Sequence, residues 1–337
     1  MNDVLLKVDD VRKEFPTHSK EVVQAVAGVS LEVHKGETLG LVGETGCGKS
    51  SLARCMAHLY DVTSGSVWFE GHEISKLSRK AMRPLRRDVQ VIFQDPYGSL
   101  NPRRRVGSII GDPFAIHNIA SGNERKKKVQ ELMELVGLNP EHYNRFPAEF
   151  SGGQRQRIGV ARALALRPKL VICDEPVSAL DVSIQAQIIN LLSDLQREFD
   201  LTYVFISHDL SVVRHVSDRI AVMYLGKIVE LAPTSELFGQ TRHPYTRALL
   251  SALPVADPDT ADSRQQIILG GDIPAATNPP TGCRFHTRCP KARLDCTAEE
   301  PALEPVLDDK PDHRAACLYP LTVGEDLSTA VPDLKAS

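Results

Sequence analysis

Short apolar runs rich in β-branched residues alternate with segments of helical spacing from residue 4 to about residue 252. Four of these runs are bounded by polar residues and predict buried strands at 37–43, 87–93, 169–175 and 201–207. A helix is expected to start at Lys49, and the spacing of apolar positions predicts another over 183–199. Such alternation is typical of an α/β fold with a mostly parallel sheet flanked by helices.

The pattern changes at two places along the chain. Between about 95 and 165 the strand signals vanish and helical spacing dominates, which predicts a helical insert within a domain spanning 1–252. After that domain the chain is rich in Pro, Asp and Gly, which indicates a linker over 253–282. Residues 283–320 have little periodicity and need a staple to hold a shape, and 321–337 are expected to be a frayed tail.

Composition fits a globular protein, with 42% hydrophobic and 25% charged residues among 337. The net charge is −3, and residues 251–337 contain 8 Lys and Arg against 14 Asp and Glu, so a nucleic-acid partner is not expected. No apolar run approaches the ~18–20 residues of a spanning helix, and the N-terminus lacks a secretory signal. We therefore expect a cytoplasmic protein, in which clustered thiols favour a metal over disulfides.

The clearest chemical motif is "GETGCGKS" at 43–50, which fits the phosphate-loop pattern G-x-x-x-x-G-K-[ST] between a predicted strand and helix. Glycines at 43, 46 and 48 let the loop curl so that its N–H groups point at phosphate oxygens. Lys49 places a cation at the β- and γ-phosphates, and the hydroxyl of Ser50 can bind Mg²⁺. Cys47 is interpreted as a small side chain that the loop tolerates.

A pair of carboxylates, Asp174 and Glu175, ends a predicted buried strand in "LVICDEP". Asp174 is suited to hold Mg²⁺, and Glu175 to polarise the attacking water. Neighbouring residues of a strand point to opposite faces, so both can serve one site only if the backbone turns after the strand.

"FSGGQRQR" at 150–157 lies between these two motifs and resembles the signature of ATP-binding-cassette (ABC) ATPases, with Phe150 in place of the usual Leu. The resemblance implies an ABC-type fold with a helical signature subdomain. It also implies that two chains sandwich two ATP molecules, the signature of each facing the γ-phosphate bound by the other. The residues concerned are Ser151, Gly152, Gly153 and Gln154, with Asp181 of "SALD" at the dimer interface.

The same resemblance assigns the remaining positions. Gln94 is similar to the glutamine that senses the metal, so Mg²⁺ is expected at Ser50, Gln94 and Asp174. His208 resembles the switch histidine at the γ-phosphate, and Phe15 the aromatic that stacks on adenine. The expected catalytic residues are Glu175, His208, Gln94 and Lys49. The expected ATP-binding residues are Phe15, Gly43, Glu44, Thr45, Gly46, Cys47, Gly48, Lys49, Ser50 and Ser51.

Segments 94–110, 175–183, 207–230 and 242–254 resemble the ATPases of dipeptide and oligopeptide ABC importers, most closely the second, F-type subunit. This implies peripheral attachment to the cytoplasmic face of the membrane. The implied partners are a sister ATPase, two permeases and, indirectly, an extracytoplasmic peptide-binding protein. Nickel, glutathione, murein-peptide, opine or microcin cargo stays open, as does a homodimer, because every motif is intact. A soluble cassette ATPase acting on ribosomes or DNA is the alternative from another class.

Four cysteines, Cys283, Cys289, Cys296 and Cys317, are separated by 5, 6 and 20 residues in the irregular C-terminal extension. Four thiolates suit a [4Fe–4S] cluster or tetrahedral Zn²⁺, and the spacing matches neither a zinc knuckle nor a ferredoxin motif. The resemblance to peptide-importer ATPases favours the [4Fe–4S] cluster, with zinc and free thiols left open. His286 and His313 are possible substitute ligands, although a surface position is the favoured interpretation. Cys55 and Cys173 are expected to be ordinary buried residues.

Overall fold

The computed structural model describes residues 3–17, 21–95, 98–253, 266–306, 312–327, 330 and 332. They form two compact units. The first unit contains Lys7–Glu32, Leu39–Trp68 and the chain from His208 onward. The second contains residues 3–6, Val33–Thr38 and Phe69–Ser207.

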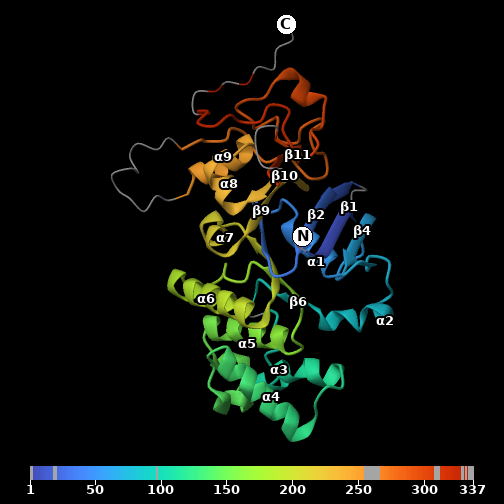
Figure 1. Ribbon diagram of the computed structural model, residues 1–337, viewed down its shortest axis with the longest axis vertical. Helices are drawn as coiled ribbons and strands as arrows, with labels where there is room; N and C mark the ends of the chain where they lie inside the picture. The colour runs from blue at the N-terminus through green and yellow to red at the C-terminus, as the bar shows by residue number, and fades with distance from the viewer. Residues whose placement is uncertain are drawn as a thin grey trace. The chain divides into compact units, whose positions relative to one another are not determined.

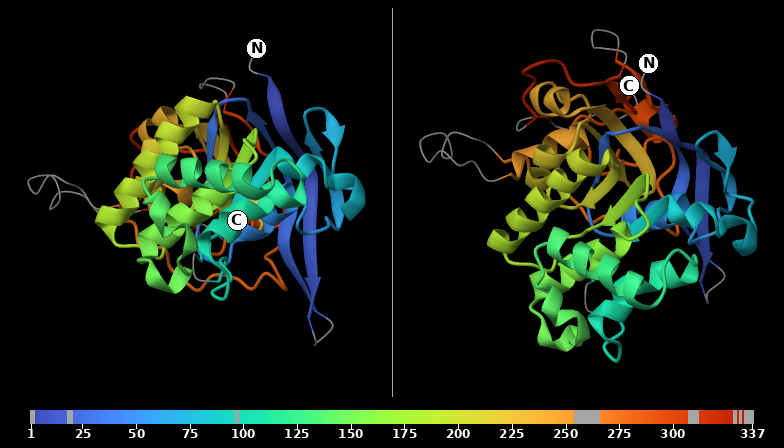
Figure 2. Two further views of the ribbon diagram at one scale, coloured as in Figure 1. Left: turned by 90° about the horizontal axis from the view of Figure 1, so that it is seen from below. Right: turned by 60° about the horizontal axis from the view of Figure 1, so that its bottom comes forward.

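The first unit contains two groups of strands. One has the order β11-β12-β10-β9-β3, and the other places β2, β1 and β4 next to one another, with β1 and β2 visible as two long strands in Figure 2. β3 runs parallel to β9, whereas β10 runs antiparallel to β9 and β12. Their bounds are β1 (Val4–Pro16), β2 (Val22–His34), β3 (Thr38–Val42), β4 (Ser64–Phe69), β9 (Arg219–Tyr224), β10 (Lys227–Pro233), β11 (Glu304–Pro305) and β12 (Arg314–Ala315).

Short helices complete the first unit. Leu52 and Met56 are one turn apart on the first helix, and both are fully buried, so this helix packs its apolar face into the core. The helices are α1 (Lys49–Met56), α7 (Leu210–Val216), α8 (Thr234–Gly239), α9 (Pro244–Ser251) and the 3-10 turn η4 (Leu294–Thr297).

The second unit places three parallel strands in the order β8-β7-β6. All five residues of β7 are buried, as expected of a strand covered on both faces. The hydroxyl of Tyr203 donates to the carbonyl oxygen of Leu192 at 3.1 Å and connects α6 (Val182–Phe199) to β8. The strands are β5 (His72–Glu73), β6 (Val89–Ile92), β7 (Leu170–Asp174) and β8 (Thr202–Ser207).

Helices α3, α4 and α5 pack against one another and appear in green to yellow-green in Figure 1. They lie in the segment where the sequence pattern is helical. The helices and turns of this unit are α2 (Arg79–Met82), η1 (Leu85–Arg87), α3 (Val106–Ile116), α4 (Gly122–Leu135), η2 (Pro140–Asn144), η3 (Pro147–Glu149), α5 (Gly152–Leu164) and α6 (Val182–Phe199).

The four strands and two helices predicted from spacing are present as β3, β6, β7, β8, α1 and α6. The expectation of a mostly parallel sheet holds for β3 with β9 and for β6, β7 and β8. It did not include the antiparallel strands β10 to β12 or the second group of strands that β1, β2 and β4 form. Residues 254–265 of the expected linker lie outside the described residues. So do 328, 329, 331 and 333–337 of the expected tail.

Within the first unit, the C-terminal extension pairs with the preceding strands through β12, where Ala315 lies opposite Glu230 of β10. The buried carboxylate of Glu230 accepts hydrogen bonds from the backbone N–H groups of Arg242 (2.7 Å) and His243 (3.0 Å) and from His313 Nε2 (2.8 Å). His313 is fully buried, so the interpretation of this residue as a surface histidine is wrong. Its imidazole is needed inside because a buried carboxylate requires hydrogen-bonding partners.

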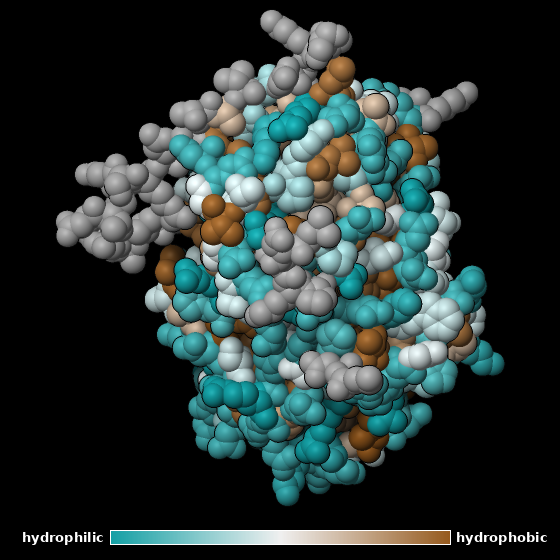
Figure 3. All heavy atoms as spheres, turned by 45° about the horizontal axis from the view of Figure 1, so that its top comes forward, coloured by the Kyte–Doolittle hydropathy of each residue, from teal (hydrophilic) through white to brown (hydrophobic). Residues whose placement is uncertain are grey.

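No helix among the described residues is long and apolar enough to cross a membrane. On the face shown in Figure 3, brown hydrophobic residues are scattered among teal ones and do not gather into one continuous patch. Isolated apolar side chains of this kind are normal on a protein surface.

Candidate active site

The loop between β3 and α1 depends on glycine at two positions where a side chain would strike backbone. Gly43 has a φ of 152°, and a Cβ there would lie 2.1 Å from the carbonyl oxygen of Met223. Gly48 has a φ of 108°, and a Cβ there would lie 2.0 Å from the carbonyl oxygen of Ala25. The glycines therefore allow both the left-handed backbone and the close approach of neighbouring strands.

Lys49 begins α1 and lies across this loop. Its Nζ donates to the carbonyl oxygens of Gly43 at 2.8 Å and Glu44 at 3.0 Å, and the side chain is only 4% exposed. A buried ammonium held by neutral carbonyls is ready to exchange these partners for an anion. Ser50 and Ser51 follow in the first turn of α1, whose N-terminus adds partial positive charge.

Two neighbours complete the loop. Thr45 is exposed, as is Gly46, which also has a positive φ of 83°. Cys47 is buried, and burial raises the pKa of its thiol, so it stays uncharged and unreactive at neutral pH.

Asp174 ends β7, and the chain turns immediately after it. Asp174 is buried, whereas the half-buried Glu175 has a φ of 47°, in the left-handed region that non-glycine residues seldom adopt. The backbone therefore turns directly after the strand, as it must if Asp174 and Glu175 are to serve one site. Gln94 Nε2 donates to Glu175 Oε2 at 2.8 Å, which brings two of the predicted catalytic side chains together.

The signature residues form the start of α5. Ser151 Oγ accepts from the N–H of Gln154 at 3.3 Å, and Gln154 Oε1 accepts from the N–H of Ser151 at 3.0 Å, which makes a capping box. Both side chains are exposed. A Cβ on Gly153 would lie 2.5 Å from Ile184 Cγ2, and one on Gly152 3.4 Å from Leu180 Cδ2. Glycine therefore lets α5 begin directly against α6.

Asp181 is the N-cap residue of α6 and is exposed, and the next residue, Val182, is 82% exposed. His208 is also exposed and follows β8 directly, before Asp209 Oδ1 caps α7 by accepting from the N–H of Ser211 at 2.8 Å.

Phe15 is half-buried, with its ring edge-on to Tyr60 at a centroid distance of 5.6 Å. Lys13 Nζ lies 5.0 Å from the Phe15 centroid and 5.8 Å from that of Tyr60. This aromatic pair with a cation is a surface on which a nucleobase can stack. The sequence did not identify Tyr60 or Lys13, because only their contacts with Phe15 in the folded protein indicate a role for them.

The four cysteines of the extension line one cavity of about 20 Å³, together with His286 and Tyr319 among others. All four are free thiols. Burial raises the pKa of Cys289 and of Cys317 to about 12, and neighbouring thiols act in the same direction. Among the described residues, no group of three or more His, Cys, Asp or Glu side chains is arranged to hold a metal ion.

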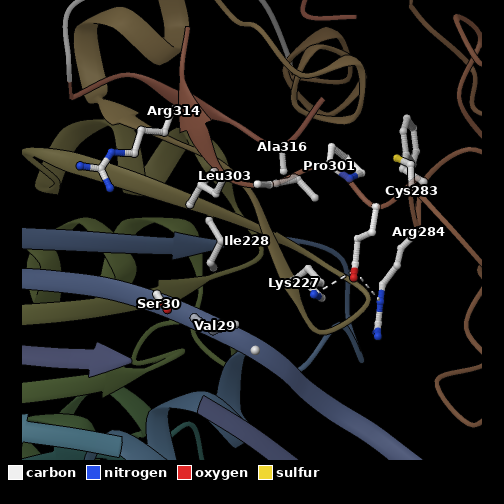
Figure 4. Close-up of a pocket in the computed structure, with 15 residues that line it drawn as sticks. Val29, Ser30, Lys227, Ile228, Cys283, Arg284, Pro301, Leu303, Arg314 and Ala316 are labelled. Atoms are coloured by element: carbon white, nitrogen blue, oxygen red, sulfur yellow. Dashed lines mark ion pairs between the residues drawn. The ribbon is translucent and has the colours of Figure 1, made fainter. Parts of the chain in front are cut away.

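His286 is half-buried, and its Nδ1 is hydrogen-bonded to the carbonyl oxygen of Cys283 at 2.8 Å. Cys55 and Cys173 are buried in α1 and β7, as the sequence predicts. Cys283 also lines a larger pocket of about 300 Å³, where Lys227 and Arg284 both pair with Glu300, as Figure 4 shows.

Comparison with known proteins identifies the class to which these motifs belong. The ABC transporter family matches residues 26–178, and the family of the oligopeptide/dipeptide transporter C-terminal region matches residues 229–296. The solved dimeric structure of the ATP-binding cassette MJ0796, bound to ADP and phosphate after hydrolysis, superimposes with a TM-score of 0.63 at 29% identity. It covers 68% of this chain and 99% of that chain.

Individual relatives are similar over nearly their whole length. The oligopeptide transport ATP-binding protein AppF of Bacillus subtilis is 53% identical over 322 residues, which are 94% of this chain and 97% of the relative. The oligopeptide transport ATP-binding protein OppF of Escherichia coli is 50% identical, covering 89% of this chain and 93% of the relative. The dipeptide transport ATP-binding protein DppF of the same organism is 47% identical, covering 89% and 91%.

The chain belongs to the ABC transporter family and has the α/β fold of its ATPases. It carries, in addition, the C-terminal region of oligopeptide and dipeptide transporters. The family prediction based on the signature and the phosphate loop is therefore confirmed.

Proposed function

We propose that this chain is the ATP-hydrolysing subunit that powers the import of dipeptides or oligopeptides by an ABC transporter. The observation that carries the proposal is the match of residues 229–296 to the C-terminal region of such transporters, joined to an ABC ATPase in one chain. The names of relatives about 50% identical over about 90% of the chain support the same cargo class. The ATPase domain is proposed to span 1–252, followed by the linker and the cysteine-rich extension.

The predicted site residues divide the work of ATP binding and hydrolysis. The phosphate loop with Lys49 binds the phosphates, and Phe15 stacks on adenine. Mg²⁺, when bound, neutralises phosphate charge, and the oxygens suited to hold it belong to Ser50, Gln94 and Asp174. Glu175 orients and deprotonates the attacking water, while His208 contacts the γ-phosphate.

The exposed start of α5 supports a second role in a dimer of cassettes. Ser151, Gly152, Gly153 and Gln154 would contact the γ-phosphate on the partner, with Asp181 and the exposed Val182 in the interface. The partner is a sister ATPase of a different chain, and the pair docks on two permeases at the cytoplasmic face of the membrane. An extracytoplasmic peptide-binding protein delivers the cargo, so cargo choice lies outside this chain.

The Glu175→Gln variant tests the hydrolytic assignment. It removes the base but keeps the phosphate loop, so we expect at least ~100-fold slower turnover with the sister ATPase present and an ATP-stabilised dimer on size exclusion. Lys49→Ala is the matched control and should lose ATP binding itself. Unchanged turnover in Glu175→Gln would remove Glu175 as the base.

The four thiols of the extension are proposed to hold a [4Fe–4S] cluster, with Zn²⁺ as the alternative. Four free cysteines line one cavity, and four thiolates are the ligands that a [4Fe–4S] cluster or a structural Zn²⁺ uses. Among the described residues the sulfurs are not already arranged as metal ligands. A bound cation would lower the raised thiol pKa values and offset the cost of burying thiolates. Its proposed role is to staple a segment that has little regular structure.

Iron, zinc and acid-labile sulfide in protein purified without oxygen decide between these groups. About four irons and four sulfides per chain, lost in Cys283→Ser and Cys289→Ser, are expected for the cluster. One zinc would replace the cluster with a zinc staple. Absence of both metals would remove the metal proposal and leave the ATPase proposal unaffected.

A further inference from the structure

The segment between Cys283 and Cys289 reaches back to the phosphate loop through Arg288. Its guanidinium donates two hydrogen bonds to the Glu44 carboxylate, Nη1 to Oε2 at 2.9 Å and Nη2 to Oε1 at 3.2 Å. The Arg288 side chain is 8% exposed and that of Glu44 26% exposed. A bidentate contact between a planar guanidinium and a planar carboxylate fixes the orientation of the two groups as well as their distance. An ion pair with one hydrogen bond fixes only the distance.

A cluster of aromatic rings supports this contact. The N–H of Glu44 donates to the hydroxyl of Tyr245 at 3.0 Å, so the residue is held by its backbone and its side chain. The Tyr245 ring lies 4.7 Å from Tyr224 and 5.3 Å from Phe285, between ring centroids. Phe285 belongs to the same cysteine-bounded segment as Arg288, and all three rings are almost completely buried. The segment therefore supplies both an anchor for Glu44 and part of the packing beneath it.

The other end of the loop is held in a related way. The carbonyl oxygen of Cys47 accepts from the N–H of Gly226 at 2.8 Å, in the turn between β9 and β10. Arg284 fixes that turn by donating to the carbonyl oxygen of Leu225 at 2.7 Å and to Gln24 Oε1 at 2.8 Å. Arg288 thus contacts the loop directly at Glu44, whereas Arg284 binds the turn whose Gly226 is hydrogen-bonded to Cys47.

The charge of Glu44 makes the contact relevant to nucleotide binding. A phosphate loop works by directing N–H groups and a lysine at an anion, and a carboxylate inside the loop opposes that field. An ion pair with Arg288 cancels this negative charge and keeps the carboxylate turned towards the extension. Without it, an uncompensated negative charge would lie within the phosphate loop itself, in a partly buried position where screening is weak.

We propose that Arg288 is a positioning residue for ATP binding, through which the cysteine-rich segment holds Glu44 and the phosphate loop in a binding-competent arrangement. The proposal rests on the assignment of 43–50 as the phosphate site. It gives the extension a direct part in nucleotide affinity, beyond stabilising its own fold. Arg288 itself need not touch ATP.

A double-mutant cycle on the full-length chain tests this role by equilibrium ATP binding. Arg288→Met should weaken ATP binding ~10- to 50-fold. Arg288→Lys keeps the positive charge but cannot form the pair of parallel hydrogen bonds, so its ATP affinity should lie between those of Arg288→Met and the unmodified protein. In a Glu44→Gln background the same Arg288→Met change should cost less than ~3-fold, because no carboxylate is left uncompensated.

Arg293→Met is the matched control. Arg293 belongs to the same extension and packs on the Tyr319 ring at 4.0 Å, without contact to the loop, so its replacement should leave ATP affinity within ~2-fold. Thermal unfolding of nucleotide-free protein separates folding from binding. A purely structural role for Arg288 would lower the unfolding temperature equally with Glu44 or Gln at position 44 and leave the ATP affinity of the folded protein unchanged.

Two outcomes distinguish this inference from the site on which it rests. If Arg288→Met binds ATP normally while Lys49→Ala does not, the positioning role is overturned and the phosphate site remains. If Lys49→Ala also binds ATP normally, the phosphate site itself is wrong.

Discussion

Single backbone contacts define the phosphate loop at the residue scale. Gly48 combines a φ of 108° with a Cβ position 2.0 Å from the carbonyl oxygen of Ala25, so alanine there meets both backbone strain and a clash that no side-chain movement relieves. We expect Gly48→Ala to lower the free energy of unfolding by about 3 kcal/mol and to abolish measurable ATP binding. Chemical denaturation and nucleotide titration measure the two effects.

Gly239→Ala is the control for this variant. Gly239 ends α8, is exposed and has no atom within 4 Å of a Cβ position, so alanine should change stability by less than ~0.5 kcal/mol. Equal losses in the two variants would contradict the steric explanation for Gly48.

Burial of a single imidazole gives a pH dependence. His243 accepts a hydrogen bond from the N–H of Tyr245 at the start of α9, and burial lowers its pKa to about 3. Between that value and the ordinary pKa of ~6.5, the unfolded chain binds a proton that the folded protein excludes. Stability from this site is therefore complete above about pH 6.5 and falls with acidification. Between pH 7 and pH 5 the loss should be ~2 kcal/mol.

His243→Asn isolates that contribution, because asparagine can accept the same capping bond but does not titrate. Other groups titrate in both proteins, so the difference between their stability–pH profiles belongs to His243. Parallel profiles over pH 5–7 would show that the folded protein accommodates the protonated imidazole.

The role of a residue could be predicted from the sequence when its partners are close to it in the sequence, and not when they are distant. The phosphate-loop residues could be read from sequence because strand, glycines and lysine are consecutive. His313 was misjudged because its partner, Glu230, is 83 positions away. The Arg288–Glu44 pair spans 244 positions and leaves no local pattern in either segment.

At the scale of elements, the start of α5 is defined by its packing on α6. A Cβ on Gly153 would lie 2.5 Å from Ile184 Cγ2, whereas a Cβ on Gly159, further along the same helix, would have no atom within 4 Å. We expect Gly153→Ala to destabilise the protein by ~1–3 kcal/mol and Gly159→Ala to be neutral or to stabilise it by up to ~1 kcal/mol through helix propensity. Urea denaturation of both variants measures the contrast.

Ile184→Ala provides the rescue for the α5 prediction. It removes the methyl group in the way, so Gly153→Ala should cost much less in that background than in the unmodified chain. An equal cost in both backgrounds would place the effect in the backbone of α5 and not in its contact with α6.

The elements that sequence spacing predicted are those with one clear pattern. β3, β7 and β8 are buried along their whole length and read as continuous apolar runs. β1 and β2 were not placed in a separate group of strands, because their long and mixed burial patterns resemble neither a buried strand nor a helix. β12 has only two residues, which is too short for a sequence pattern, and it pairs with β10 beside the hydrogen bond between His313 and Glu230.

Over the chain as a whole, segments distant in sequence meet at one point. Cys289 follows Arg288 directly and lines the cavity shared by the four thiols. If the extension acts on the phosphate loop through Arg288, a change in that cavity is expected to weaken the hold of Arg288 on Glu44. We expect Cys289→Ser to weaken ATP binding ~3- to 10-fold in the full-length chain. In an Arg288→Met background the same replacement should have no further effect, because the contact through which it acts is already absent.

The Arg293→Met background is the control for this coupling, and there Cys289→Ser should keep its full effect. Equilibrium ATP titrations of the three backgrounds, with unfolding temperatures measured on the same samples, give the complete comparison. Equal effects of Cys289→Ser in the Arg288→Met and Arg293→Met chains would mean that the thiol cavity influences nucleotide binding by a route other than Arg288. If Cys289→Ser weakens ATP binding in none of the three backgrounds, the extension and the phosphate loop are energetically independent, despite the ion pair that joins them.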